Sequence, residues 1–170
     1  KDSMSGTFED LTVPPTLAAF AVDVVDADKV ISPEFKSPGS KVYVIPAPHD
    51  SFDLPAFQRL NMNFQKVGKL ISEKKVLSAS TVGIGGIAAA VSKMALGNNI
   101  GFTFETIPDR EKLYAPAYGT LIIEVVDTAD LSEALEGTGF YELGHTMAAP
   151  SMVCGQMVAT LKEVREAYTK

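Results

Sequence analysis

Cysteine and positive charge are both scarce in this 170-residue chain. Cys154 is the one cysteine, so no disulfide can form within the chain, which fits a reducing, cytoplasmic setting. The formal net charge of -6 disfavours duplex nucleic acid as a partner, because that binding needs a basic face. The longest apolar runs, such as Leu121–Val126, are far shorter than a membrane-spanning helix. We therefore expect a cytoplasmic protein that binds neither nucleic acid nor membrane.

Histidine is scarce too, which limits the catalytic and metal chemistry that the chain offers. His49 and His145 lie far apart in the sequence, and no metal-ligand spacing links either of them to Cys154. Asp50 and Asp53 follow His49, but we interpret Asp53 as the N-cap of the next helix. No Ser/His/Asp or Cys/His arrangement for nucleophilic catalysis is recognisable. We predict no catalytic residue in this chain.

Apolar residues are plentiful, at 46%, and charged residues make up 21%, which favours a packed core over disorder. The length suits one domain with a piece of a neighbour. The chain begins with Lys1 instead of methionine, and no apolar signal segment follows. We expect it to be a piece of a longer polypeptide.

Hydrophobic periodicity predicts short strands that alternate with helices. The expected strands are Thr16–Val25, Lys41–Ile45, Val76–Ser80, Ile100–Glu105, Gly119–Val126 and Phe140–His145. The expected helices are Asp53–Lys74, Gly86–Leu96 ending at Gly97-Asn98-Asn99, a short one beginning at Asp130 and Glu133, and Pro150–Tyr168, which would carry Cys154. The segment Thr106–Ala117 is expected to be a loop or a short helix. This order predicts the α/β (α+β) class, with helices packed on a mixed sheet.

The helix predicted at Asp53–Lys74 has the clearest apolar stripe, with apolar residues at three- and four-residue steps. Its members are Leu54, Phe57, Leu60, Phe64, Val67, Leu70 and Ile71. We interpret the stripe as core and not as a binding groove.

The most informative segment is Val76–Gly97, with the sequence VLSASTVGIGGIAAAVSKMALG. It is typical of a strand, a glycine-rich turn and an alanine-rich helix. Glycine allows positive φ and close approach of a ligand, and the free N–H groups at a helix start favour anions. Gly83, Gly85 and Gly86 are therefore candidate phosphate-binding residues.

Two other interpretations of this turn remain open. Residues Gly83–Ala88 satisfy the G-x-G-x-x-A dinucleotide fingerprint, and Glu105 ends the next strand, where a ribose-binding carboxylate belongs. An NAD-binding oxidoreductase domain is thus one alternative, although prolines interrupt Thr106–Tyr118. The other alternative is that the glycines serve only close packing of the helix on the sheet.

Three motifs occur in the order found in the phosphoribosylformylglycinamidine synthase family: KDSMSG at Lys1–Gly6, VPPTL at Val13–Leu17, and SASTVGIGGIAAAVSKMALG at Ser78–Gly97. From Lys1 to about Met147 the chain resembles the second AIR-synthase-type unit of the large, multidomain form. The resemblance implies that residues 1–36 are the tail of an N-terminal subdomain with its connector. It implies that residues 37–170 are a C-terminal domain in an α/β/α layered, PurM C-terminal-like arrangement.

The resemblance also implies a function, that of a C–N ligase of de novo purine biosynthesis. Such an enzyme converts formylglycinamide ribonucleotide (FGAR), ATP and glutamine to the amidine, ADP, phosphate and glutamate, with ATP and Mg²⁺ as cofactors. The implied partners are the other domains of the same chain, namely the N-terminal subdomain, the other half and a glutaminase domain. The piece alone would be inactive. Lys1, Asp2, Ser3 and Ser5 match the family motif and are candidate phosphate contacts.

The glycine turn departs from the family pattern at its acidic positions. Where the family commonly has HDxSDGG, this chain has Ser80 and Thr81 before the turn and Ile84 inside it. Thr81 and Ile84 thus replace acids, and hydroxyls are weak magnesium ligands compared with carboxylates. We predict no metal ligand here, and the hypothesis is that the chain is a non-catalytic structural or auxiliary half of the enzyme.

Overall fold

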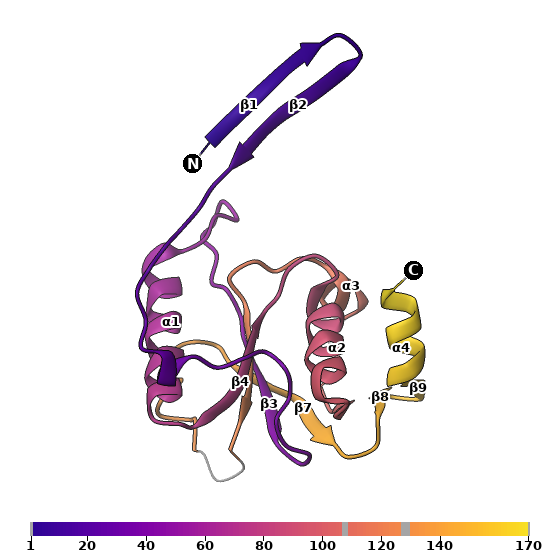
Figure 1. Cartoon of the computed structure of the whole chain (residues 1–170). Coiled ribbons are helices and arrows are strands. Elements are labelled where there is room, and N and C mark those ends of the chain that lie inside the picture. The colour runs from indigo at the N-terminus through magenta and orange to yellow at the C-terminus, as the bar shows by residue number, and fades with distance from the viewer. Residues whose placement is uncertain (1, 107–108, 127–129, 170) are drawn as a thin grey trace. The chain divides into compact units, whose positions relative to one another are not determined.

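Figure 1 shows the computed structural model, which describes residues 2–106, 109–126 and 130–169. The chain divides into two compact units, Lys1–Val30 and Ile31–Lys170, and each is described by itself. Among the described residues, no helix combines the length and the apolar composition needed to cross a membrane.

The first unit is a β-hairpin followed by an extended segment. Strands β1 (Asp2–Phe8) and β2 (Leu11–Ala18) pair antiparallel, and a short 3-10 helix, η1, spans Ala27–Lys29. The strand predicted at Thr16–Val25 is wrong in its bounds, because β2 begins before the two prolines at 14 and 15 and ends at Ala18. A hairpin strand has one unpaired edge, and proline is tolerated where no ladder hydrogen bond is needed.

The second unit is built on a mixed seven-stranded sheet with the order β4-β6-β3-β7-β5-β8-β9. Its strands are β3 (Lys41–Ile45), β4 (Val76–Thr81), β5 (Gly101–Phe104), β6 (Leu121–Val125), β7 (Tyr141–Met147), β8 (Ser151–Cys154) and β9 (Met157–Thr160). Neighbouring strands β5 and β8 are parallel, and the other neighbours pair antiparallel. The predicted class, a mixed sheet with helices, is confirmed.

Helices cover both faces of this sheet (Figure 1). Helix α1 (Phe57–Ser72) lies on one face, while α2 (Gly86–Asn98), α3 (Arg110–Tyr114) and α4 (Leu161–Tyr168) lie on the other. Alternate strand residues enter the two cores: Val44 and Ile122 pack with α2, whereas Ile45 and Ile123 pack with α1. The period of two along each strand thus produces the predicted α/β/α layering.

The closing helix predicted over Pro150–Tyr168 is wrong in its first half. Residues 151–160 form the hairpin β8–β9, and α4 begins only at Leu161. Cys154 consequently lies in strand β8 instead of on a helix. A short apolar stretch satisfies helical and strand periodicity equally well, so pairing of β8 with β5 decides the outcome.

Helix α1 starts later than predicted. It begins at Phe57 with Ala56 as its N-cap, so the prediction that Asp53 caps it is wrong. Asp50 organises the preceding turn instead, since its Oδ1 accepts hydrogen bonds from the N–H groups of Phe52 (2.8 Å) and Leu54 (3.0 Å).

The apolar stripe of α1 is core only in its second half. Val67 and Leu70 are buried, but Phe57 and Phe64 are 74% and 44% exposed. The prediction that the whole stripe is core is therefore wrong for its first two turns.

Two further predicted helix boundaries differ in the structure. The segment that follows Asp130 forms hydrogen-bonded turns and not a helix, with Asp130 Oδ1 accepting from Ser132 N–H at 3.0 Å.

Helix α2 runs through Gly97 to Asn98, and the left-handed C-cap is Asn99. A Cβ atom at Gly97 would overlap Glu34 Cβ, so this glycine serves packing instead of the helix stop.

The segment that packs against the end of α2 contains a strongly perturbed carboxyl group. Hydrogen bonds from the Lys36 ammonium and the Ser32 hydroxyl lower the pKa of Glu34 from 4.5 to about 2. The folded state is therefore stabilised fully above about pH 4.5, and this contribution is lost as the pH falls through 2.

We expect an NMR titration of the Glu34 side-chain carboxyl carbon to give a midpoint near 2. In Lys36→Met, which lacks the ammonium donor, the pKa should rise toward the ordinary value. A wild-type midpoint near 4.5 would contradict the hydrogen bonds seen at this carboxylate.

Candidate functional site

The glycine turn joins the end of β4 to the start of α2. Gly85 is the N-cap of α2, with a left-handed φ of 86°, and Gly86 follows with φ of 67°. The Gly86 N–H donates to the Gly83 carbonyl (3.0 Å), and the Ala89 N–H donates to the Gly85 carbonyl (3.2 Å). Two successive positive φ angles explain why glycine occupies both positions.

The three glycines of the turn differ in what surrounds them. A Cβ atom at Gly86 would overlap the Leu113 carbonyl oxygen and lie 2.6 Å from the carbonyl carbon of Tyr114. The backbone of α3 thus packs directly against the start of α2. At Gly83, in contrast, the nearest atom is Tyr118 Cε1 at 3.9 Å. Packing accounts for Gly86, whereas a side chain at Gly83 would make only an ordinary contact.

This arrangement limits where a phosphate can approach the turn. The Gly86 N–H already donates within the turn, and the electronegative Leu113 carbonyl oxygen lies against this residue. Within the turn, Ile84 is the residue most open to solvent, at 82% exposed. The backbone of α3 therefore fills the space beside Gly86, whereas Ile84 is open to solvent.

The residues at the turn do not fit a magnesium ion. Thr81 ends β4 with a hydroxyl, and Ile84 contributes an apolar side chain. Mg²⁺ is held in proteins chiefly by carboxylates, phosphate oxygens and water. Within residues 2–106, 109–126 and 130–169, no group of three or more His, Cys, Asp or Glu side chains is placed to hold a metal ion.

The strand order contradicts the dinucleotide-binding alternative. In that fold, the strand before the glycine turn and the next strand, which carries the ribose-binding acid, lie side by side. Here β6, β3 and β7 separate β4 from β5. Glu105, which follows β5, instead pairs with His145, whose Nδ1 lies 2.9 Å from Glu105 Oε1. The fingerprint at Gly83–Ala88 is thus a match of sequence without the matching topology.

The candidate phosphate contacts near the N-terminus stay predictions. Lys1 lies outside the described residues, and only the backbone of Asp2 and Ser3 is described. Ser5 is an exposed residue of β1. These residues belong to the first unit, and Gly83, Gly85 and Gly86 to the second; phosphate binding by either set stays a prediction.

The sequence analysis missed a buried carboxylate on β6, the strand that pairs with β4. Glu124 of β6 is fully buried, and its side chain accepts hydrogen bonds from Lys36 N–H (2.8 Å), Ser37 N–H (3.0 Å) and Ser78 Oγ (2.8 Å). It therefore ties the segment that enters the second unit to the strand that ends at the turn. A lone glutamate inside the apolar run at 121–126 was the available signal, because such a residue needs buried partners.

The pairing of β3 with β7 also brings Lys41, Tyr43 and Glu142 together at the surface. Tyr43 OH donates to Glu142 Oε2 (3.1 Å), and Lys41 Nζ lies 3.2 Å from the same oxygen. The hydrogen bond to Glu142 raises the pKa of Lys41, while burial and then the Glu142 charge raise the pKa of Tyr43. Exposed pairs of this kind contribute little to stability, and nothing here resembles a catalytic arrangement.

Comparison with known proteins identifies a relative of low identity. No family model matches the chain. The PurL subunit of phosphoribosylformylglycinamidine synthase from Methanobrevibacter smithii is 24% identical over 145 residues, which cover 69% of this chain and 20% of the relative. The chain thus spans about a fifth of the length of that curated relative.

Solved structures share the fold. PurL from Thermotoga maritima complexed with ATP has a TM-score of 0.66 at 15% identity, covering 82% of this chain and 28% of PurL. Its complex with FGAR has a TM-score of 0.64 at 15% identity, covering 80% and 29%. The hydrogenase maturation protein HypE in complex with ATP has a TM-score of 0.57 at 18% identity, covering 81% and 54%. The chain therefore resembles part of the PurL subunit of phosphoribosylformylglycinamidine synthase in sequence and shares the fold of the corresponding part of the PurL structures.

Proposed function

We propose that this chain is part of an enzyme that converts FGAR, ATP and glutamine to the amidine, ADP, phosphate and glutamate. Residues 1–36 would be the end of an N-terminal subdomain with its connector, and residues 37–170 the C-terminal domain. The observation that carries the proposal is the β4–turn–α2 segment within a fold shared with PurL structures that hold ATP and FGAR.

In that reaction, ATP would convert the amide oxygen to a leaving group, and Mg²⁺ held by other parts of the polypeptide would neutralise phosphate charge. Ammonia from glutamine then displaces the activated oxygen. The remaining domains of the same polypeptide, including the other half and a glutaminase domain, would supply the substrate and ammonia sites. Lys1, Asp2, Ser3 and Ser5 are proposed to contact phosphate.

Within such an enzyme, we assign this chain to a structural or auxiliary half. Thr81 and Ile84 stand where carboxylates would hold Mg²⁺, and α3 packs against Gly86 at the start of α2. The turn keeps its glycines, but it lacks metal-binding acids. A working metal–nucleotide site would therefore lie elsewhere in the polypeptide.

The proposal is tested by measuring FGAR-dependent ADP release. We expect the 170-residue chain to release none, and the polypeptide that also contains the other domains to release ADP only with FGAR, ATP and an ammonia source. A longer polypeptide that binds NADH and ignores FGAR would contradict the proposed reaction.

The auxiliary role makes a separate prediction about Gly83. In the longer polypeptide, we expect Gly83→Val to leave the rate of ADP release within about twofold, because an auxiliary half does not contact the reacting groups. A tenfold loss would correspond to about 1.4 kcal/mol of transition-state stabilisation. A Cβ atom at Gly83 would make only an ordinary contact with Tyr118 Cε1 at 3.9 Å, and Gly83 is not among the glycines with positive φ, so the variant should fold. A large loss of rate, or calorimetric binding of Mg-ATP to the 170-residue chain that Gly83→Val removes, would contradict it.

A further inference from the structure

An apolar cavity of about 490 Å³ lies between α2, α3 and α4, over strands β5, β8 and β9. No residue of the glycine turn lines it. Protein interiors pack with few voids larger than a water molecule, whereas clefts that bind small molecules enclose roughly 300–1,000 Å³. The cavity therefore has the size of a ligand site and not of a packing defect.

Small side chains create the space where larger ones would fill it. Ala88 and Ser92 lie one turn apart on α2, and Ala159 lies on β9. Met157, on the rim, does not fill the space and stays 66% exposed, although a methionine side chain can adapt to fill gaps.

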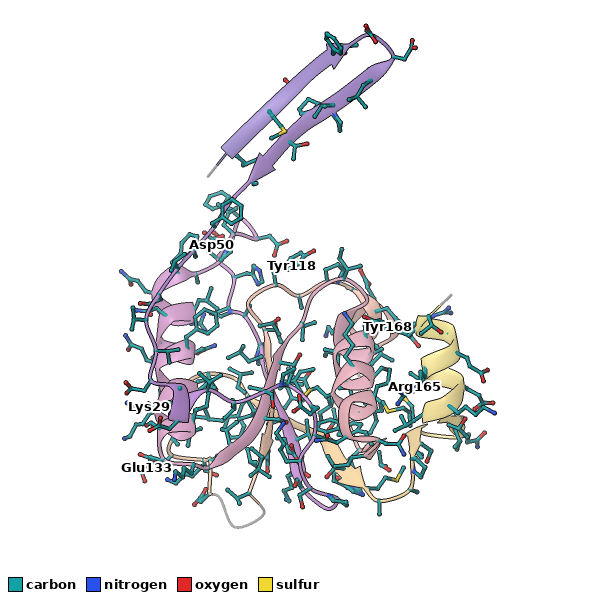
Figure 2. All side chains as sticks on the ribbon, in the orientation of Figure 1. Lys29, Asp50, Tyr118, Glu133, Arg165 and Tyr168 are labelled. Carbon is teal, nitrogen blue, oxygen red and sulfur yellow. The ribbon has the colours of Figure 1, made fainter. Side chains whose placement is uncertain are left out.

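Helix α4 forms one wall of the cavity and carries Arg165 and Tyr168 (Figure 2). A capping box between Thr160 and Glu163 fixes the first turn of the helix. Arg165 Nη2 donates to the Leu96 carbonyl at 3.4 Å, and Lys93 Nζ lies 5.8 Å from the centre of the Tyr168 ring. The last two contacts join α4 to α2, while the rim stays open to solvent at Tyr114, Met157 and Val158, which are 53%, 66% and 66% exposed.

The chemistry of the lining selects against charge. None of the residues that the structure places around the cavity is charged, and burying an unpaired charge is costly. The thioethers of Met152 and Met157 and the ring of Phe104 are favourable partners for the edge or face of an aromatic ring.

Ser92, Tyr114 and Cys154 provide the polar atoms of the lining. Two hydroxyls and one thiol suffice to orient a single polar group of a ligand. We propose that this cavity binds a neutral, flat aromatic molecule that makes a hydrogen bond to one of these side chains. This site is separate from the proposed function and does not depend on it.

The test uses N-phenyl-1-naphthylamine, a neutral aromatic probe whose fluorescence rises in apolar surroundings. We expect saturable binding of about one probe per chain, and roughly tenfold weaker binding to Ala88→Phe, which fills the cavity. Ser92→Leu serves as a second filling variant in case the first does not fold. The control is Phe64→Ser on the exposed stripe of α1, which should bind the probe as wild type does.

Cys154 offers an independent readout, because it lines the cavity and is the only cysteine of the chain. Saturating probe should slow its alkylation by N-ethylmaleimide about fivefold or more. Unchanged binding to folded Ala88→Phe and Ser92→Leu, loss of binding in Phe64→Ser, or unchanged alkylation of Cys154 would each overturn the proposal. So would sedimentation showing a dimer that excludes the probe.

Discussion

Replacing Gly86 by alanine is expected to lower the free energy of unfolding by about 3 kcal/mol or more. The added methyl group would overlap the Leu113 carbonyl oxygen and approach the Tyr114 carbonyl carbon within 2.6 Å, and backbone atoms cannot rotate away as a side chain can. The residue also has φ of 67°, which strains any side chain with a Cβ. Urea unfolding followed by circular dichroism measures the loss.

Gly83→Ala is the matched control, because it changes the same turn by the same methyl group. Its Cβ atom would meet only Tyr118 Cε1 at 3.9 Å, an ordinary contact. We expect a cost below about 1 kcal/mol. Equal losses in the two variants would mean that α3 does not pack against the start of α2 as described, and the steric argument about phosphate approach would fail with it.

Glu124→Gln is expected to destabilise the chain by about 2–4 kcal/mol. Each carboxylate oxygen accepts a backbone N–H, from Lys36 at 2.8 Å and from Ser37 at 3.0 Å. A glutamine has one oxygen and one NH₂ group, so in either orientation a donor faces a donor. Ser78 Oγ, the third partner, cannot compensate for the lost acceptor. The variant should unfold at a lower urea midpoint with an unchanged slope.

The control for this prediction is Glu142→Gln, which makes the same chemical change on the surface. Glu142 contacts Lys41 and Tyr43, and its side chain is 31% exposed. Water can replace those partners, so we expect a loss below about 1 kcal/mol. A Glu124 variant as stable as the Glu142 variant would show that the buried carboxylate does not anchor residues 36 and 37.

Sequence reasoning predicted β3 and the edge strand β4 well, but it missed the hairpin β8–β9 at the opposite edge of the sheet. The segments Lys41–Ile45 and Val76–Ser80 were found because buried strands are apolar and bounded by turn residues. Residues 151–160 were assigned to a helix because valine, methionine and alanine fit both periodicities. What makes β8 a strand is its pairing with β5, some 50 residues earlier, which no local pattern encodes.

The candidate site shows the same division. The position of the turn and the missing acids at Thr81 and Ile84 were visible in the sequence, because they depend on residue identity alone. The failure of the dinucleotide interpretation was not visible, since it follows from the three strands between β4 and β5. The cavity beside Cys154 was hidden as well, because it requires β8, β9 and α4 in place of one helix.

By itself, the sequence determined the α/β class, the glycine turn with its helix, the hydroxyl and apolar residues Thr81 and Ile84 at that turn, and the resemblance to PurL. These follow from local backbone preference and from the chemistry of single side chains. Only the tertiary structure decided the strand order, the burial of Glu124 with its hydrogen bonds from the Lys36 and Ser37 N–H groups, and the packing of α3 on Gly86. Those features arise from contacts between distant segments, whose energies depend on burial and geometry that a local pattern does not contain.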